Sequence, residues 1–331
     1  MNPREIVRRT LAFEYPERVA HSFEPSDFIF GGSEIPNPLT EWHKIAEHGW
    51  ERTDEWGNVW RRVDATSKGQ VVRGVLEDLQ DVATCPLPDF SDRSLYVHAQ
   101  EIFASAPELW HIGSIQGFTF KMAQGLRKFD QYLMDLVSEP AKIALLHDRI
   151  DEQIGWQIQR LSESGADSVM AWEDWGTQAR TFISPRLWRR EFKPRYRSLC
   201  IRAHDLGCSV ILHSCGKLTE IVPDLIECGV DVLQFDQPRI HGIETLAQIQ
   251  QRNRVTFWCP VDIQTTLQTR DEALIRREAD KLLDALWAGR GGFIAGFYPD
   301  PTSIGLEPRW QAIANDEFSR HRSQVGTRLA A

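Results

Sequence analysis

The sequence lacks the long apolar segments that mark membrane and secreted proteins. No apolar run approaches the roughly 18 residues that a membrane-spanning helix needs. The opening stretch MNPREIVRRTLAFEYPERV contains neither the apolar core nor the small-residue cleavage site of a signal peptide. We therefore expect a cytoplasmic protein with no membrane partner.

The chain also lacks an excess of positive charge. Its 47 acidic residues outnumber its 38 lysines and arginines, and the formal net charge is −9. Nucleic-acid-binding proteins usually carry a basic face, so we expect no nucleic-acid partner. Internal repeats and low-complexity tracts are absent as well. A length of 331 residues, 42% of them hydrophobic, suits a single large domain with its own core.

Cysteine is scarce, with six in the chain. In a reducing compartment we expect these cysteines to be free thiols. Cys200, Cys208 and Cys228 resemble small buried hydrophobic residues, and Cys85 falls in a loop. Cys215 differs because it follows His213 by two positions in VILHSCGKL. In a cytoplasmic protein this combination is typical of metal binding or catalysis.

From about residue 100 onward, short β-like segments alternate with longer helical patterns. Six strands are expected within 109–115, 166–174, 208–215, 230–236, 254–262 and 291–300, and a seventh within 18–25. Such alternation implies parallel strands joined by helical crossovers. No strand is followed by the G-x-G-x-x-G turn of a dinucleotide-binding sheet. We therefore predict an α/β fold, a TIM-type (β/α)₈ barrel in which one strand is not located.

Residues 26–100 interrupt the alternation. The segment WERTDEWGNVWRRV (50–63) predicts a β-hairpin around Trp56-Gly57-Asn58, and PLPDFSD (86–92) indicates a turn-rich connector. We expect one domain over residues 1–331, in which 26–100 form an N-terminal excursion that covers one end of the barrel.

Polar and reactive residues gather at the C-terminal ends of the predicted strands. They are Glu173, Asp174, His213, Cys215, Asp236, Cys259, Asp262, Tyr298 and Asp300. Barrel enzymes build their active sites at this end of the strands. The pattern therefore indicates an enzyme.

His213 and Cys215 are the first candidates for metal ligands. At positions i and i+2 of an extended strand their side chains project from the same face, and imidazole nitrogen and thiolate sulfur both bind zinc. A third ligand is required, and Cys259 at the tip of a later strand is the leading candidate.

The acidic and aromatic residues near these ligands complete the predicted site. Glu173 and Asp174 face opposite sides of a strand end; we prefer Asp174 as the residue in the barrel mouth, although it could instead cap the following loop. Asp174 or Asp236 could orient His213 through its second ring nitrogen, and both are candidate catalytic residues, together with Tyr298. The expected walls of a cofactor pocket are Trp172, Trp175 and Phe297.

The chain resembles the uroporphyrinogen decarboxylase superfamily over most of its length. The resemblance rests on residues 2–19, EWGNVWRR (55–62), WEDWGTQARTFISPRLWRREFKPRYRSL (172–199), VILHSCGKLTEIVPDLIECGVDVLQFDQP (210–238), CPVDIQTTL (259–267) and GGFIAGFYPD (291–300). It implies a TIM barrel, in agreement with the strand and helix pattern. True uroporphyrinogen decarboxylases carry an N-terminal RQAGR-type motif that binds substrate carboxylates, and nothing similar occurs in residues 15–60.

The His-x-Cys-Gly motif is similar to that of the corrinoid-linked methyltransferases. In that branch, zinc held by one His and two Cys activates a thiol, and related members move methyl groups between methylated substrates and a corrinoid protein. The resemblance assigns His213 and Cys215 to the first two ligand positions. The family's other Cys falls near the last strand, where this chain has AGFYPD. Either Cys259 replaces it, or an oxygen of Asp300, Asp236 or Tyr298 does, or zinc is weakly bound or absent.

The resemblance thus implies zinc-dependent methyl transfer between a small O-, N- or S-methylated substrate or thiol and a corrinoid. The corrinoid (methylcobalamin) would be carried on a partner protein or bound at the barrel mouth, and a homo-oligomer is compatible with the sequence. A second hypothesis is a metal-free decarboxylase or lyase acting on a carboxylated aromatic or tetrapyrrole-like substrate. It requires a basic cluster at the barrel mouth, for which Arg180, Arg186 and Lys217 are the candidates. A third is a non-catalytic binding barrel.

Overall fold

A parallel sheet of eight strands forms the centre of the protein. The computed structural model describes residues 1–35, 39–47 and 49–328. The strand order is β1-β12-β11-β10-β9-β8-β7-β2, and all neighbouring strands are parallel. The strands are β1 (Ala20–His21), β2 (Phe28–Gly32), β7 (Trp110–Ile115), β8 (Ser168–Trp172), β9 (Ser209–His213), β10 (Val232–Gln234), β11 (Thr256–Cys259) and β12 (Phe293–Ala295).

The two edge strands of this sheet are joined through Asp27. The carboxylate of Asp27 accepts a hydrogen bond of 2.8 Å from the backbone N–H of His21, at the end of β1, and pairs with the buried Arg18. The curled sheet with its surrounding helices is a TIM-barrel-like α/β fold, as the sequence predicts. The strand that the sequence analysis did not locate is β2, inside the segment assigned to the excursion.

Alternating side chains of the strands face two separate cores. Met170, Ile211, Val232, Trp258 and Ile294 pack together inside the curled sheet. Their neighbours along each strand pack outward against the helices. Because side chains alternate along a strand, this division fixes which face each terminal residue occupies. His213 falls two positions after Ile211 and therefore points inward.

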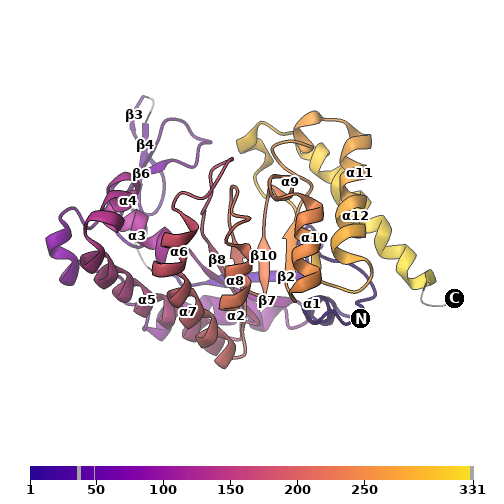
Figure 1. Ribbon diagram of the computed structural model, residues 1–331, viewed down its shortest axis with the longest axis horizontal. Helices are drawn as coiled ribbons and strands as arrows, with labels where there is room; N and C mark the ends of the chain where they lie inside the picture. Colours follow the sequence, from indigo (N-terminus) through magenta and orange to yellow (C-terminus); the bar gives the residue numbers. More distant parts are fainter. Residues whose placement is uncertain (36–38, 48, 329–331) are drawn as a thin grey trace.

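Helices cover the outer face of the sheet (Figure 1). They are α1 (Pro3–Ala12), α2 (Val97–Ser105), α3 (Thr119–Arg127), α4 (Phe129–Ser138), α5 (Pro140–Glu163), α6 (Pro185–Glu191), α7 (Lys193–Asp205), α8 (Val222–Cys228), α9 (Pro238–His241), α10 (Ile243–Arg252), α11 (Glu272–Leu282) and α12 (Pro308–Arg328). Helix α1 is an exception, because its Ile6 and Val7 join the core inside the sheet. Within the described residues, no helix is both long and apolar enough to cross a membrane.

Local sequence signals set several helix boundaries. Pro140 stands at the first position of α5, where its missing N–H costs nothing, and thereby separates α5 from α4. The side-chain oxygen of Ser184 accepts a hydrogen bond of 3.2 Å from the backbone N–H of Leu187 and so caps α6.

A second, antiparallel sheet is formed by β3 (His43–Ala46), β4 (Gly49–Thr53), β5 (Val59–Arg62) and β6 (Gln70–Arg73). The predicted hairpin corresponds to β4 and β5, and its turn contains Gly57 at a φ of +86°. The carboxylate of Asp54 accepts hydrogen bonds from the backbone N–H groups of Trp56 and Asn58 and so stabilises the turn. In Figure 1 this sheet stands beside α3 and α4 at one end of the molecule.

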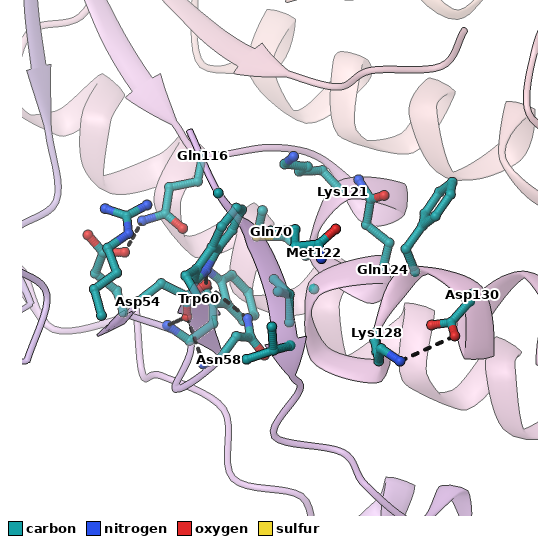
Figure 2. A pocket seen from close by; sticks show the side chains of 18 residues that line it. Asp54, Asn58, Trp60, Gln70, Gln116, Lys121, Met122, Gln124, Lys128 and Asp130 are labelled. Carbon is teal, nitrogen blue, oxygen red and sulfur yellow. Dashed lines mark hydrogen bonds and ion pairs between the residues drawn. The ribbon is translucent and has the colours of Figure 1, made fainter. Parts of the chain in front are cut away.

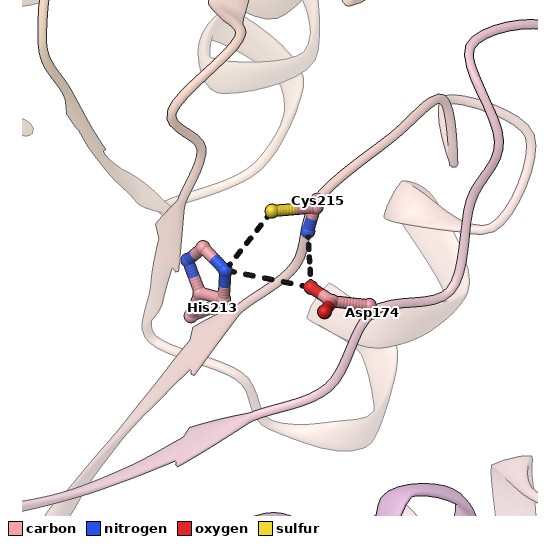
Figure 3. A group of neighbouring side chains, drawn as sticks. All are labelled: Asp174, His213 and Cys215. Carbon is pink, nitrogen blue, oxygen red and sulfur yellow. Dashed lines mark hydrogen bonds and ion pairs between the residues drawn. The ribbon is translucent and has the colours of Figure 1, made fainter. Parts of the chain in front are cut away.

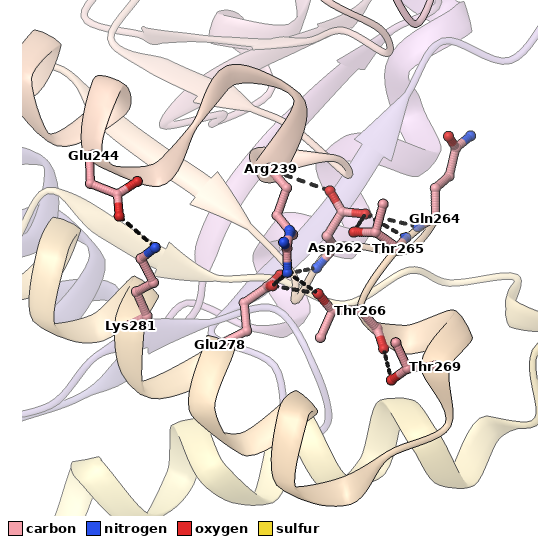
Figure 4. Close-up of polar contacts among 9 residues, drawn as sticks. All are labelled: Arg239, Glu244, Asp262, Gln264, Thr265, Thr266, Thr269, Glu278 and Lys281. Atoms are coloured by element: carbon pink, nitrogen blue, oxygen red, sulfur yellow. Dashed lines mark hydrogen bonds and ion pairs between the residues drawn. The ribbon is translucent and has the colours of Figure 1, made fainter.

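Helix α9, which follows β10, and the loop that follows β11 are tied to α11 through Glu278 (Figure 4). Its carboxylate accepts hydrogen bonds from the Asp262 backbone N–H at 2.8 Å, from Arg239 at 3.1 Å and from the Thr266 hydroxyl. The Asp262 carboxylate in turn accepts from the backbone N–H groups of Gln264 and Thr265. These contacts give Asp262 a structural role in holding one side of the barrel mouth.

Candidate metal centre at the barrel mouth

Asp174, His213 and Cys215 come together where β8 and β9 end (Figure 3). His213 Nε2 lies 3.4 Å from Cys215 Sγ and 3.5 Å from Asp174 Oδ1. One potential ligand atom from each residue lies within 4.8 Å of the other two. Two strand ends therefore supply an imidazole, a thiol and a carboxylate to one point.

The orientation of His213 is set by a chain of hydrogen bonds from β10. His213 Nδ1 contacts Gln234 Oε1, and the Gln234 amide nitrogen donates a 2.8 Å hydrogen bond to Asp236 Oδ1. Because Asp236 takes the amide N–H, the amide oxygen is the end of Gln234 that faces His213. Nδ1 is therefore a donor, and Nε2 is left to face Cys215 and Asp174.

A close backbone contact between two glycines holds the two strand ends together. Gly216 has a φ of +76°, and a Cβ at this position would lie 2.1 Å from the carbonyl oxygen of Gly176. The backbone N–H of Lys217 donates a 2.7 Å hydrogen bond to the carbonyl of Thr177. The backbone N–H of Cys215 likewise donates a 2.9 Å hydrogen bond to Asp174 Oδ1. Glycine at both positions lets the loops approach closely enough for Asp174 to join the other two residues.

The three groups perturb one another electrostatically. Burial alone would raise the pKa of Asp174, but its hydrogen bond to His213, the His213 charge, the Cys215 N–H and the Lys121 charge together hold it well below the usual range. Burial would lower the pKa of His213, but Asp174, Cys215 and the charge of Asp236 raise it well above its usual value. Burial raises the pKa of the Cys215 thiol despite the opposing effect of His213. A metal ion bound here would displace protons from both His213 and Cys215.

The donor set and its spacing fit a zinc ion. Zinc bonds of about 2.0–2.3 Å place neighbouring donors of a tetrahedral site roughly 3.3–3.7 Å apart, which matches the 3.4 and 3.5 Å separations around His213 Nε2. Three protein ligands would leave a fourth position for a substrate atom, the arrangement of catalytic zinc sites. The Gln234 side-chain oxygen contacts the second ring nitrogen, as a carboxylate or carbonyl oxygen usually does beside a zinc-binding histidine.

Cys259, the third ligand expected from the sequence, lies elsewhere. It is the outward-facing neighbour of Trp258, fully buried between the sheet and the helices, and burial strongly raises the pKa of its thiol. Among the described residues, the group able to hold a metal contains Asp174 and not Cys259. The metal-ligand role of Cys259 stays a prediction, and the position of its side chain does not support it.

The two neighbouring acids face opposite sides of the chain, as alternation predicts. Asp174 faces the mouth, whereas Glu173 is fully buried and its Oε1 accepts a 2.9 Å hydrogen bond from the Lys121 backbone N–H. Burial raises the pKa of Glu173 to about 8. Asp236 is buried and interacts with His213 through Gln234, whose amide nitrogen donates a hydrogen bond to the Asp236 carboxylate.

The predicted pocket walls divide into two groups. Trp172 is half-buried against the core inside the sheet, and Phe297 is half-buried after β12. Trp175 is fully buried instead, stacked on Phe120 with a centroid separation of 4.0 Å, and its indole N–H donates to Tyr196. It belongs to an aromatic core and does not line an open pocket.

Tyr298, the third predicted catalytic residue, is contacted by a lysine from the antiparallel sheet. The Lys68 ammonium lies 5.5 Å from the centre of the Tyr298 ring. Burial would lower the pKa of Lys68, but its hydrogen bond to Tyr298 and, to a smaller extent, the charges of Tyr298, Cys215 and Asp174 raise it. The loop between β5 and β6, which carries Lys68, therefore extends over the barrel mouth as far as Tyr298, after β12. Asp300 is exposed and caps the following turn through the backbone N–H of Ser303.

Sequence reasoning missed Gln234 and Lys68. The alternation of β10 could have identified Gln234, since it occupies the inward position next to His213 in the sheet register. No local signal marks Lys68, because its place depends on how the antiparallel sheet packs. Arg180, Arg186 and Lys217, the basic residues required by the decarboxylase hypothesis, are exposed.

Comparisons with known proteins address the fold and the family. A methyltransferase from Methanosarcina mazei has a similar structure, with a TM-score of 0.63 and 15% identity over 98% of this chain and 86% of that one. A D-psicose 3-epimerase gives a TM-score of 0.46 at 10% identity, covering 75% of this chain and 87% of the epimerase. No curated protein sequence matches the chain. The family described as uroporphyrinogen decarboxylase (URO-D) matches residues 66–297, a segment that includes all three members of the metal-competent group. With well over half of its length matched, the chain belongs to the uroporphyrinogen decarboxylase family.

Proposed function

We propose that this protein is a zinc-dependent methyltransferase that moves a methyl group between a small methylated substrate or thiol and a corrinoid carried by a partner protein. The observation that carries the proposal is the convergence of Asp174, His213 and Cys215 at the spacing of zinc ligands. The structural similarity to a methyltransferase supports it at the level of the fold.

Bound at these ligands, zinc would act as a Lewis acid and would lower the pKa of a thiol or of a leaving oxygen or nitrogen at its fourth position. The residues of this chain prepare that position. Gln234 and Asp236 hold His213 with Nε2 toward the site. Asp174 would supply the third ligand, an oxygen, from the end of β8, whereas the resemblance implies a cysteine near the last strand. Lys68 brings a positive charge to the mouth, where it can stabilise an anionic substrate group.

Metal analysis of matched variants tests the proposal. We expect protein purified without chelator to contain about one zinc per chain, and Asp174→Ala, His213→Ala and Cys215→Ala to contain little. Cys259→Ala is the matched control, since it also removes a thiol, and it should keep its zinc. Metal-free protein that transfers methyl groups at an unchanged rate would contradict the proposal.

A metal-free decarboxylase remains the second candidate, and one observation favours it. Lys68 and Lys121 both interact electrostatically with Asp174 and could bind a substrate carboxylate. Loss of substrate CO₂ at an undiminished rate in the presence of a strong chelator would identify this reaction. Inhibition by the chelator, reversed by zinc, would exclude it.

A further inference from the structure

A pocket of about 880 Å³ lies between the antiparallel sheet and α3 (Figure 2). Trp60, Met122 and Phe129 contribute apolar surface, and Gln70 and Gln124 contribute amides. Its volume falls in the range of small-molecule sites, which are mostly apolar with a few placed polar groups. None of the three candidate zinc ligands lines it.

The acidic residues of this pocket already have partners. Asp54 accepts hydrogen bonds from the Trp60 indole N–H at 2.6 Å and from the Asn58 amide at 3.0 Å. Glu55 accepts from the Gln116 amide. Asp130 pairs with Lys128 at 3.2 Å. These carboxylates are committed to the protein's own structure.

Two cations of the pocket have no such partner. The Lys121 ammonium lies 5.9 Å from the centre of the Trp60 ring, and the Arg52 guanidinium lies 5.4 Å from the same centre. Within the described part of the chain, neither forms an ion pair with a carboxylate within 4.0 Å. Arg52 Nε is buried without a hydrogen-bond acceptor, and so is the indole N–H of Trp56. The uncompensated groups of this pocket are donors and positive charges.

The pocket is adjacent to the candidate metal centre through the first turn of α3. The backbone N–H of Lys121 binds Glu173, the neighbour of Asp174, and a Cβ at Gly117 would lie 2.9 Å from the carbonyl of Trp172. The pocket therefore lies beside the end of β8, the strand end that carries Asp174.

We infer that this pocket binds a small organic anion in which a carboxylate is joined to an apolar, ring-sized body. Lys121 meets the carboxylate, the Arg52 charge beside the Trp60 ring adds to the attraction, and Trp60, Met122 and Phe129 contact the body. One part of the inference rests on the proposed function, namely that the bound anion is the substrate of the neighbouring metal site. The binding of an anion in the pocket does not require zinc.

Calorimetry with benzoate as the probe tests the inference on the full-length protein in excess EDTA. Benzoate should bind at least tenfold more tightly than benzyl alcohol, which has the same ring without the charge. Lys121→Met should weaken benzoate binding roughly tenfold or more, the size expected for loss of a charge-assisted hydrogen bond, and Arg52→Gln should weaken it by a smaller factor.

Lys128→Met is the matched control, because Lys128 lines the same pocket but is paired with Asp130. It should change benzoate affinity less than threefold. Equal binding of benzoate and benzyl alcohol, no benzoate binding, or an equal loss in Lys128→Met and Lys121→Met would overturn the inference. The experiment is done without zinc, so its result does not depend on the proposed metal chemistry. If the purified protein contains no zinc but still binds benzoate as expected, the inference about the pocket stands and only the zinc proposal fails.

Discussion

Gln234 directs its side-chain oxygen at Nδ1 of His213 and thereby leaves Nε2 pointing at Cys215 and Asp174. The two residues sit side by side in the register of β9 and β10. The inward-facing Gln234 on β10 thus determines which ring nitrogen of His213, on the neighbouring β9, faces the metal site.

Gln234→Met should weaken zinc binding because it removes the acceptor that holds His213 in place. Loss of such a supporting contact typically costs 10–100-fold in metal affinity. Competition with a chromophoric zinc chelator measures the change. Thermal unfolding of the zinc-free variant shows whether the fold is retained. Unchanged zinc affinity in a folded variant would show that Gln234 does not position His213.

Gly216→Ala should disrupt the contact that joins the two strand ends. Gly207 offers a matched control, because it has a φ of +80° but no atom within 4 Å of an added Cβ, whereas an added Cβ at Gly216 would lie 2.1 Å from the Gly176 oxygen. Alanine at either position pays for a left-handed backbone, about 1–2 kcal/mol. Gly216→Ala should cost about 1–3 kcal/mol more through overpacking and should weaken zinc binding. Equal unfolding free energies and zinc affinities of the two variants would contradict this account of Gly216.

Buried Glu173 should make stability depend on pH. Its pKa rises from 4.5 to about 8 on folding, so between these values the folded protein holds a proton that the unfolded chain releases. The contribution of this group to stability is fully present below about pH 4.5 and is lost as pH rises through 8, with a slope of up to about 1.4 kcal/mol per pH unit.

Glu173→Gln cannot ionise and should lack this component. Relative to the variant, the natural protein should therefore lose unfolding free energy in urea as the pH is raised from 5 to 8. Parallel stability curves for the two proteins would show that Glu173 is ionised in the folded state.

Much of the fold could be predicted from the sequence because its signals are local. Alternating apolar segments marked seven of the eight strands, and Pro140 and Ser184 marked helix boundaries. Strand β2 escaped because its sequence, FIFGG, is short and ends in two glycines. The antiparallel sheet was only partly predicted, since β3 and β6 depend on pairing with the hairpin.

The site residues that lie on one strand end could be predicted from the sequence, whereas those that come together from different strands were harder to predict. His213 and Cys215 share one strand end, so their spacing alone indicated a pair. That Asp174 joins them depends on the contact between Gly176 and Gly216, two residues 40 positions apart. Strand alternation could have argued against Cys259, because Trp258 faces inward and its neighbour must face the helices.

X-ray absorption at the zinc edge of the purified protein tests the central claim most directly. The account predicts one sulfur at about 2.3 Å, with nitrogen and oxygen ligands at about 2.0–2.2 Å. The sulfur contribution should vanish in Cys215→Ala and persist in Cys259→Ala. Two sulfurs per zinc in the natural protein, or a sulfur that disappears with Cys259, would contradict the assignment of Asp174, His213 and Cys215 as the protein ligands.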